Sequence, residues 1–366
     1  MPSADELLGS GVVRSLAACL AKSSDGRSFA AVAASARSLG ELGLSDRARL
    51  VRDALLADVP GGWPELAAVV RPALADPAFT GWMIWPVSEA VATRATDPTA
   101  PATAFEEGLA MLAELTSRLT GEFAIRTFLS AELDRTLAAV MGWTRHADEH
   151  VRRLATEGTR PRLPWARRVP AISADPGCTV AVLDELYRDE SEYVRRSVAN
   201  HLNDISRADP ALAVDVAARW LGAPDANTAR LVRHAMRTLI KAADPGALAL
   251  LGFAPPVDLV VSGPHLSTQT VPIGGSFAFE IAVHNGGAEP VRVVIDYVVH
   301  YRKAKGALAP KVFKLATRTL AAGETYAVTR SHAFVELSTR RHHPGGHAIE
   351  LQVNGQTFGH VAFEVT

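Results

Sequence analysis

The side chains with the clearest chemical potential lie between Arg145 and Arg168, a stretch called the basic segment below. It holds seven arginines and three acids, a formal sum of 7 − 3 = +4, whereas the whole chain carries −1. A concentrated positive stretch on a nearly neutral chain favours a polyanionic partner, such as a nucleic acid backbone. Glu157 lies inside this stretch, where a purely phosphate-binding surface would have no use for an acid.

Glu157 has two interpretations. It follows Arg153 by four residues, so the two could form an intrahelical ion pair that contributes about 0.3–0.5 kcal/mol. Alternatively, the carboxylate has a functional role. Gly158 then ends the helix and lets another group approach closely. The residues alone leave both interpretations open.

Two further acids and one tryptophan are also candidates. Glu122 opens a predicted helix, where the helix dipole favours a carboxylate. Asp204 is placed near a helix C-terminus, where the dipole disfavours negative charge. Trp165 stands on a cationic loop held by Pro161 and Pro164. It could pack on a neighbouring helix or stack against a base or sugar.

Other patterns are weaker. His146 and His150 are four residues apart, a spacing that can bind a metal, but no third ligand is evident and we expect no metal. The stretch 340–347 is basic and rich in turn residues, so it could bind phosphates or be a solvated hairpin. Residues 82–86, with two tryptophans, are expected to belong to the core. No phosphate-binding glycine loop or hydrolase elbow is present, and we expect no cofactor.

The basic segment belongs to an internal repeat. The motif that begins at Val151 recurs at Val194 and Val232, with offsets of 194 − 151 = 43 and 232 − 194 = 38 residues. Helix-pair repeats of about 40 residues are typical of HEAT-like solenoids, which present a long concave surface. The register places cationic side chains in a row. This row comprises Arg153, Arg196 and His234, followed by Arg237 and Lys241.

The spacing of apolar residues changes after residue 253, from that of helices to that of strands. Phe277, Phe279, Ile281 and Val283 occupy alternate positions, which is the period of a strand with one buried face. Asn354-Gly355 indicates a tight hairpin turn. About 110 residues of this kind fit an immunoglobulin-like antiparallel β-sandwich. We therefore predict a mainly α chain, with a HEAT-like solenoid over 1–253 and a β-sandwich over 254–366.

Composition limits the remaining classes. The two cysteines are too few for a disulfide framework, which fits a reducing compartment. No apolar run approaches the roughly 20 residues of a membrane span, and the N-terminus lacks the pattern of a secretory signal. These observations favour a soluble cytoplasmic protein with no membrane partner.

The stretch Val151–Trp165, with its Glu-Gly-Thr-Arg-Pro-Arg-Leu-Pro-Trp core, resembles the AlkC family of bacterial DNA alkylation repair glycosylases. Residues 121–128 and 82–86 are similar to that family as well, as is the order of solenoid and β-sandwich. The resemblance implies a monofunctional DNA-3-methyladenine glycosylase of base excision repair. It would hydrolyse N-glycosidic bonds of 3-methyladenine and 3-methylcytosine without full base flipping, and associate with the nucleoid as a monomer.

The resemblance also implies site residues. The catalytic acids would be Glu157, Glu122 and Asp204, with Trp165 in the lesion pocket. The partner would be double-stranded DNA containing N-methylated bases. The expected DNA-binding residues are Arg153, Arg160, Arg162, Arg196, His201, His234, Arg237, Lys241, Arg340, Arg341, His342 and His343. The alternative is a non-catalytic protein that recognises bent or damaged DNA, or a protein scaffold, because solenoids and immunoglobulin-like domains often only bind.

Overall fold

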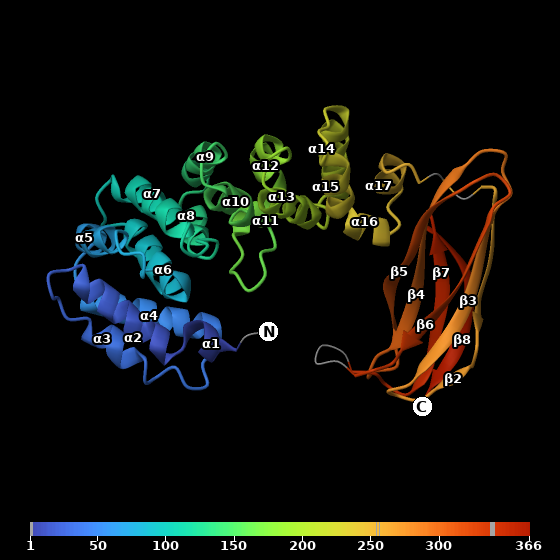
Figure 1. Ribbon diagram of the computed structural model, residues 1–366, viewed down its shortest axis with the longest axis horizontal. Helices are drawn as coiled ribbons and strands as arrows, with labels where there is room; N and C mark the ends of the chain where they lie inside the picture. The colour runs from blue at the N-terminus through green and yellow to red at the C-terminus, as the bar shows by residue number, and fades with distance from the viewer. Residues whose placement is uncertain (1–2, 254, 256, 337–340) are drawn as a thin grey trace. The chain divides into compact units, whose positions relative to one another are not determined.

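The computed structural model describes residues 3–253, 255, 257–336 and 341–366. The chain forms two compact units, Met1–Ala235 and Met236–Thr366. The first is built from helices, and the second from short helices followed by strands (Figure 1). The predicted fold class, a helical solenoid followed by a β-sandwich, is confirmed.

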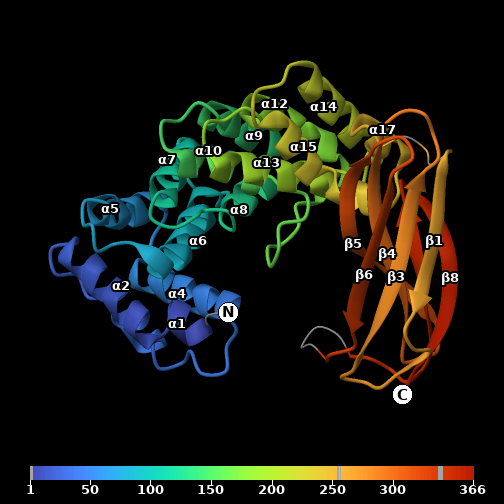
Figure 2. The same ribbon diagram turned by 45° about the vertical axis from the view of Figure 1, so that its right-hand side comes forward.

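The helices of the first unit follow one another as stacked layers (Figures 1 and 2). They are α1 (Ala4–Leu8), α2 (Ser10–Lys22), α3 (Ala30–Ser35), α4 (Leu44–Asp58), α5 (Trp63–Ala73), η1 (Gly81–Met83), α6 (Ile84–Ala95), α7 (Ala104–Thr116), α8 (Ile125–Ala131), α9 (Leu133–Trp143), α10 (Glu149–Glu157), α11 (Pro170–Ala174), η2 (Pro176–Thr179), α12 (Val180–Leu186), α13 (Glu192–Ile205), α14 (Pro210–Gly222) and α15 (Thr228–Ala235).

The predicted repeat places three helices side by side, with α10 packed on α13 and α13 packed on α15. The repeated valines, Val151, Val194 and Val232, are all buried. The arginines that follow the first two valines are buried too. Arg152 donates to the carbonyls of the loop before α10, and Arg195 donates to those of the loop before α13. These two arginines therefore stabilise the turns between repeats.

The second unit has two helices and eight strands among its described residues. They are α16 (Arg237–Lys241), α17 (Pro245–Leu250), β1 (Leu259–Leu266), β2 (Thr270–Val271), β3 (Ser276–Asn285), β4 (Val291–Arg302), β5 (Leu308–Leu320), β6 (Thr325–Ala333), β7 (Gly345–Val353) and β8 (Gln356–Val365). One sheet has the order β1-β3-β6 and the other β2-β8-β7-β4-β5.

The alternating apolar residues of β3 and β4 form the core between the sheets, as their period predicts. Asn354 and Gly355 join β7 to β8 with φ values of 45° and 86°. A two-residue hairpin turn with positive φ at both positions matches the right-handed twist of the strands. The predicted hairpin is therefore confirmed.

The second unit begins before the sequence boundary predicted at residues 253 and 254. Leu248 and Phe253 are buried together with Val294 of β4. The guanidinium of Arg292 donates to the carbonyl of Leu251 at 2.8 Å and lies 5.0 Å from the centre of the Phe253 ring. These contacts place α17 with the β-sandwich, and Ile240 of α16 packs against the same buried residues. Ala254 and Pro256 of the expected linker lie outside the described residues.

Candidate active site

Three carboxylates and two guanidiniums form a continuous chain in the helical unit. Glu122 Oε2 lies 2.5 Å from Nη1 of Arg153, whose Nη2 lies 3.4 Å from Glu157 Oε1. The same Glu157 oxygen accepts from Nη1 of Arg160 at 2.6 Å. Arg160 Nε then donates to Asp204 Oδ2 at 2.8 Å. The structure thus brings the three acids predicted from the sequence into one acidic cluster, a term used below for these five residues.

The acidic cluster is largely withdrawn from water and carries an excess of negative charge. The side chains of Glu157 and Asp204 are each 8% exposed. Two guanidiniums and three carboxylates leave a formal charge of 2 − 3 = −1. Because partial burial lowers the effective dielectric constant, these carboxylates attract a cation more strongly than at the open surface, although the charge of Arg207 offsets part of that of Asp204. The cluster is suited to bind or stabilise positive charge.

Local structure explains how the acids converge. Glu122 lies just before α8, Glu157 ends α10 and Asp204 is in the last turn of α13. Gly158 follows Glu157 at the point where α10 meets α8. A Cβ at Gly158 would come within 2.6 Å of the Ile125 side chain, so the close approach of these helices requires glycine.

A second layer of polar groups holds Glu157. The hydroxyl of Ser197 on α13 donates to Glu157 Oε2 at 2.6 Å and also contacts the hydroxyl of Thr156. The carbonyl of Thr156 lies 2.8 Å from Nδ1 of His201, and the hydroxyl of Thr179 lies 2.9 Å from Nε2. Both oxygens of Glu157 are therefore held, because Oε1 is bound by arginine and Oε2 by serine.

His201, which the sequence assigned to DNA binding, is 0% exposed and cannot contact DNA. Burial lowers its pKa to about 3, so the ring is neutral. A neutral ring satisfies both of its partners: Nδ1 carries the proton toward the Thr156 carbonyl, and Nε2 meets the Thr179 hydroxyl. The corrected role of His201 is to join α10 to α13 beneath the acidic cluster.

Burial raises the pKa of Asp204, and the hydrogen bond from Arg160 opposes part of that rise. Desolvation of this carboxylate therefore outweighs the attraction of its partner. A further cation at the cluster would therefore lower the pKa of Asp204, because added positive charge stabilises the ionised carboxylate.

Arg126 is a site residue that the sequence reasoning missed. Its Nη1 donates to the carbonyls of Gly158 and Arg160, both at 3.0 Å, and its Nε donates to that of Arg167 at 2.5 Å. Burial lowers its pKa to about 10, which leaves it charged near neutral pH. One buried guanidinium thus holds both ends of the loop that carries Trp165. No sequence signal distinguishes Arg126 from an arginine on a solvated helix face.

An aromatic pocket of about 110 Å³ adjoins the acidic cluster. Trp82, Trp85, Phe123 and Trp165 line it together with Glu122. The Trp85 and Phe123 rings are stacked, with centroids 4.4 Å apart. Glu122 belongs to both the pocket and the acidic cluster, so the two form one continuous site. Aromatic faces beside a carboxylate are suited to a planar cation.

The structure modifies the expectation that residues 82–86 are only core. Trp85 is buried, but Trp82 is half-buried and both line the aromatic pocket. Nε1 of Trp85 donates to Glu89 Oε1 at 2.9 Å, which fixes the orientation of the indole. Burial raises the pKa of Glu89, against the hydrogen bond from Trp85. Glu89 is thus a second positioning residue that the sequence reasoning did not identify.

Trp165 stands at the rim of the aromatic pocket with 80% of its surface exposed. Its φ of 60° lies in the left-handed region, which is uncommon for a bulky residue. Such backbone conformations persist where the surrounding structure imposes them and are frequent at functional sites. The exposed indole is available to a ligand and is not packed on a neighbouring helix.

Two of the arginines predicted to bind DNA have another role. Arg160 is buried and the Arg153 side chain is only 15% exposed, and each guanidinium contacts two carboxylates of the acidic cluster. Their charge is compensated there, so we correct their assignment from phosphate binding to holding the acids. Arg162, by contrast, is exposed on the loop between α10 and α11.

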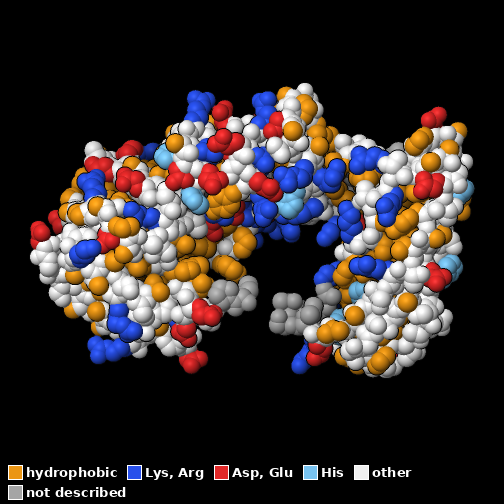
Figure 3. Space-filling model, viewed as in Figure 1, with side chains coloured by type: hydrophobic (Ala, Val, Ile, Leu, Met, Phe, Trp, Pro, Cys, Tyr) orange, Lys and Arg blue, Asp and Glu red, His pale blue; other side chains and the backbone are white. Residues whose placement is uncertain are grey.

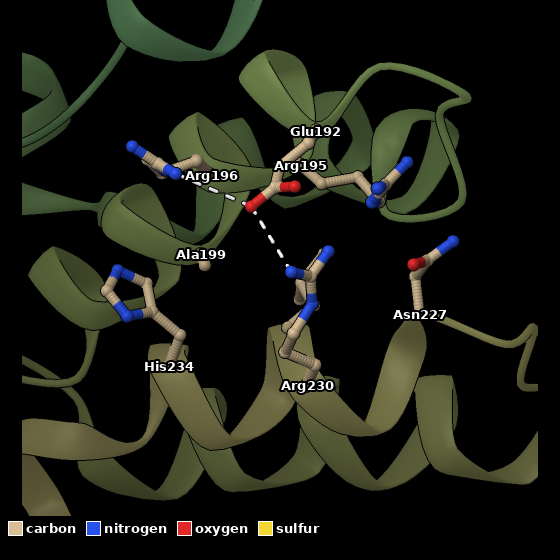
Figure 4. Close-up of a pocket in the computed structure, with 8 residues that line it drawn as sticks. Glu192, Arg195, Arg196, Ala199, Asn227, Arg230 and His234 are labelled. Carbon is tan, nitrogen blue, oxygen red and sulfur yellow. Dashed lines mark hydrogen bonds and ion pairs between the residues drawn. The ribbon is translucent and has the colours of Figure 1, made fainter.

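Arg196 and His234 line a pocket of about 330 Å³ between α13 and α15, called the α13–α15 pocket below (Figure 4). Arg195, Arg230 and Asn227, which the sequence did not single out, line it too. Glu192 lies between Arg196 and Arg230, and the charge of Arg230 and the hydrogen bond from Arg196 lower its pKa. On the face shown in Figure 3, Lys and Arg side chains gather over this part of the helical unit.

The remaining candidates belong to the second unit. Arg237 is half-buried, whereas Lys241 and Arg341 are exposed. His343 is half-buried, and its carbonyl lies 3.0 Å from Nε2 of His347. Arg340 lies outside the described residues.

His342 requires correction, because it is 3% exposed. Its ring packs 5.1 Å from that of Phe334, and its Nε2 lies 3.2 Å from the carbonyl of Val335. A ring buried against the sandwich core cannot reach DNA. The turn-rich sequence around it did not reveal that burial.

Within the described part of the chain, no group of three or more His, Cys, Asp or Glu side chains could hold a metal ion. The ring of His146 accepts a hydrogen bond from the backbone of Asp148 at 3.0 Å. No helix among the described residues is long and apolar enough to cross a membrane.

Comparison with known proteins matches both parts of the chain. Residues 260–366 match the family described as the C-terminal Ig-like domain of the uncharacterised protein YhaZ. YhaZ of Bacillus subtilis (strain 168) is 38% identical over 261 residues, which is 71% of this chain and 72% of that protein.

A solved structure resembles this chain over its whole length. Alkylpurine DNA glycosylase AlkC of Pseudomonas fluorescens, bound to DNA containing an abasic site analog, superposes with a TM-score of 0.88. The two sequences are 32% identical, and the match covers 100% of each chain.

Proposed function

This chain belongs to the AlkC family, and we propose that it is a DNA glycosylase that hydrolyses the N-glycosidic bond of cationic alkylated bases in double-stranded DNA. One observation carries the proposal: Glu122 belongs both to a cluster with a formal charge of 2 − 3 = −1 and to an aromatic pocket. The aromatic faces receive a planar cationic base, and the carboxylates meet the positive charge that develops on the sugar.

We propose 3-methyladenine and 3-methylcytosine as the substrates. A methylated base with a fixed positive charge is already a good leaving group, so no general acid is needed. Trp165 stands exposed at the pocket rim, where it contacts the lesion. As the resemblance to the family implies, we propose that the reaction does not depend on complete base flipping, unlike most glycosylases.

The carboxylates act as electrostatic catalysts. When the glycosidic bond breaks, positive charge moves to C1′ and the sugar acquires oxocarbenium character. Glu157 is the principal stabiliser of this charge and orients the attacking water, while Glu122 and Asp204 complete the acidic pocket. Arg153 and Arg160 are positioning residues, because they hold these acids at fixed points.

DNA binding is separate from chemistry in this proposal. Arg162, Arg196 and His234 lie outside the acidic cluster and contact the backbone phosphates. The second unit contributes further phosphate contacts, from Arg237, Lys241, Arg341 and His343. Backbone contacts imply little sequence preference. The enzyme acts as a monomer on nucleoid DNA in the cytoplasm and needs no cofactor.

The test is base release from methylated duplex DNA under single-turnover conditions. We expect wild type to release 3-methyladenine, and Glu157→Gln to be slower by about 100-fold or more, because it loses the charge that the transition state needs. Glu190→Gln is the matched control, since it removes an acid whose side chain is 88% exposed and lies outside the acidic cluster.

Near-normal release by Glu157→Gln would refute the role of Glu157. Absence of release by wild type, with tight duplex binding, would favour a protein that recognises damaged DNA without cutting it. Absence of both release and binding would favour a protein scaffold.

A further inference from the structure

A carboxylate lies at the centre of the α13–α15 pocket (Figure 4). Glu192 Oε1 lies 3.4 Å from Nη2 of Arg196 and 3.2 Å from Nη1 of Arg230. Arg196 is one turn along α13, whereas Arg230 comes from α15. Two guanidiniums from separate helices therefore converge on one anionic oxygen.

This arrangement does not resemble a structural ion-pair network. The side chains of Arg196 and Arg230 are 68% and 61% exposed, and Glu192 is more than half exposed as well. Exposed ion pairs of this kind add little to stability. The buried arginines Arg152 and Arg195 already stabilise the neighbouring turns. The pocket thus holds two guanidiniums, those of Arg196 and Arg230, that contribute little to the stability of the fold.

Convergence of guanidiniums on one oxygen is also the way proteins bind phosphate. A pocket of about 330 Å³ that opens to solvent leaves room for an incoming anionic group beside Glu192. His234 and Asn227, which also line the pocket, can add hydrogen bonds to such a group.

We infer that the α13–α15 pocket binds one backbone phosphodiester of duplex DNA and that Glu192 occupies the phosphate position until DNA displaces it. The inference rests on the proposed function and adds Arg230 and Glu192 to it. Glu192 keeps both arginines directed at one point, and its charge opposes the approach of any phosphate. It therefore lowers affinity for DNA with and without a lesion, which limits retention on undamaged sequence.

The experiment measures binding of the full-length protein to a fluorescently labelled undamaged duplex over a range of salt concentrations. Glu192→Gln keeps the shape of the side chain and removes its charge, so we expect about fivefold tighter binding. Arg230→Ala should weaken binding and reduce the salt slope by about one. Glu190→Gln removes the same charge two residues away, outside the pocket, and should change affinity little.

A purely structural Glu192 would give a different result. Glu192→Gln and Glu192→Ala would then lower the Tm and leave affinity equal to that of Glu190→Gln, or weaker, and the inference would be overturned. Base release from methylated duplex is measured in parallel. Normal release and duplex binding without the gain in affinity would overturn only this inference, whereas absence of duplex binding by wild type would overturn the proposed function as well.

Discussion

The guanidinium of Arg153 donates to the carboxylate of Glu122 at 2.5 Å, across 31 residues of sequence. The pair joins the middle of α10 to the loop before α8, and Arg153 also lies 3.4 Å from Glu157. An arginine inside a basic segment is therefore engaged by acids. Under the proposed function, its contribution is the placement of two carboxylates.

Two variants should affect different steps: Arg153→Ala should slow base release, and Arg196→Ala should weaken duplex binding. Loss of Arg153 leaves Glu122 and Glu157 repelling each other, and a displacement of about 1 Å can reduce base release roughly 100-fold. Loss of the exposed Arg196 should reduce the salt slope of duplex binding by about one. Single-turnover release and salt-dependent binding of both variants are the measurements. Equal defects in both assays would contradict the division of roles.

Trp165→Ala should impair lesion recognition without affecting stability. The side chain is 80% exposed, so little packing is lost, and the replacement of one base-stacking contact corresponds to about 1–3 kcal/mol. We expect Kd for methylated duplex to rise by about fivefold or more, with an unchanged Tm. Trp220→Ala, which removes a buried tryptophan, serves as the contrasting control for stability. A marked fall in Tm for Trp165→Ala would show that the indole packs on the protein.

Arg126→Met should release the loop that carries Trp165. The substitution leaves the carbonyls of Gly158, Arg160 and Arg167 without their donor, at an expected cost of about 3 kcal/mol or more. Denaturant unfolding measures the loss, and limited proteolysis between residues 158 and 168 measures loop opening. Arg162→Ala, an exposed neighbour on the same loop, is the control. Equal protease resistance of the two variants would contradict the anchoring role of Arg126.

Acid should destabilise the helical unit partly through His201. Burial lowers its pKa from 6.5 to about 3, so between these values the unfolded chain binds a proton that the folded chain does not. The free energy of unfolding therefore falls as pH decreases below about 6.5. His201→Gln should flatten this dependence, measured as Tm against pH. A variant as acid-sensitive as wild type would assign the effect to other groups.

Asp296 on β4 should have the opposite effect on the pH dependence of stability. Burial raises its pKa from 3.8 to about 6, so the folded state binds a proton that the unfolded state has lost. Its stabilising effect is present below pH 3.8 and is lost as pH rises through about 6. Asp296→Asn should therefore stabilise the protein at pH 7.5 by up to about 3 kcal/mol. Calorimetry at pH 4 and pH 7.5 checks this, because the gain should vanish at the lower pH.

The spacing of apolar residues predicted the architecture because it indicates which positions of a helix or strand are buried. The valines at 151, 194 and 232 mark one helix face, and the alternation from Phe277 to Val283 marks one strand face. These periods depend only on backbone geometry, which neighbouring residues share. The resemblance of residues 151–165 to a known family supplied the three acids, which the fold then brought together.

The environment of each charge depended on the tertiary structure. Arg160 binds Asp204 from 44 residues away, and His201 is buried by helices that are distant in sequence. The aromatic pocket likewise combines residues from Leu44 to Trp165. A sequence shows that an arginine or histidine is present, but its pKa, exposure and partners are set by groups that only folding brings within a few ångströms. For this reason the sequence could name the acids of the candidate site, whereas the structure decided which cations hold them and which remain exposed.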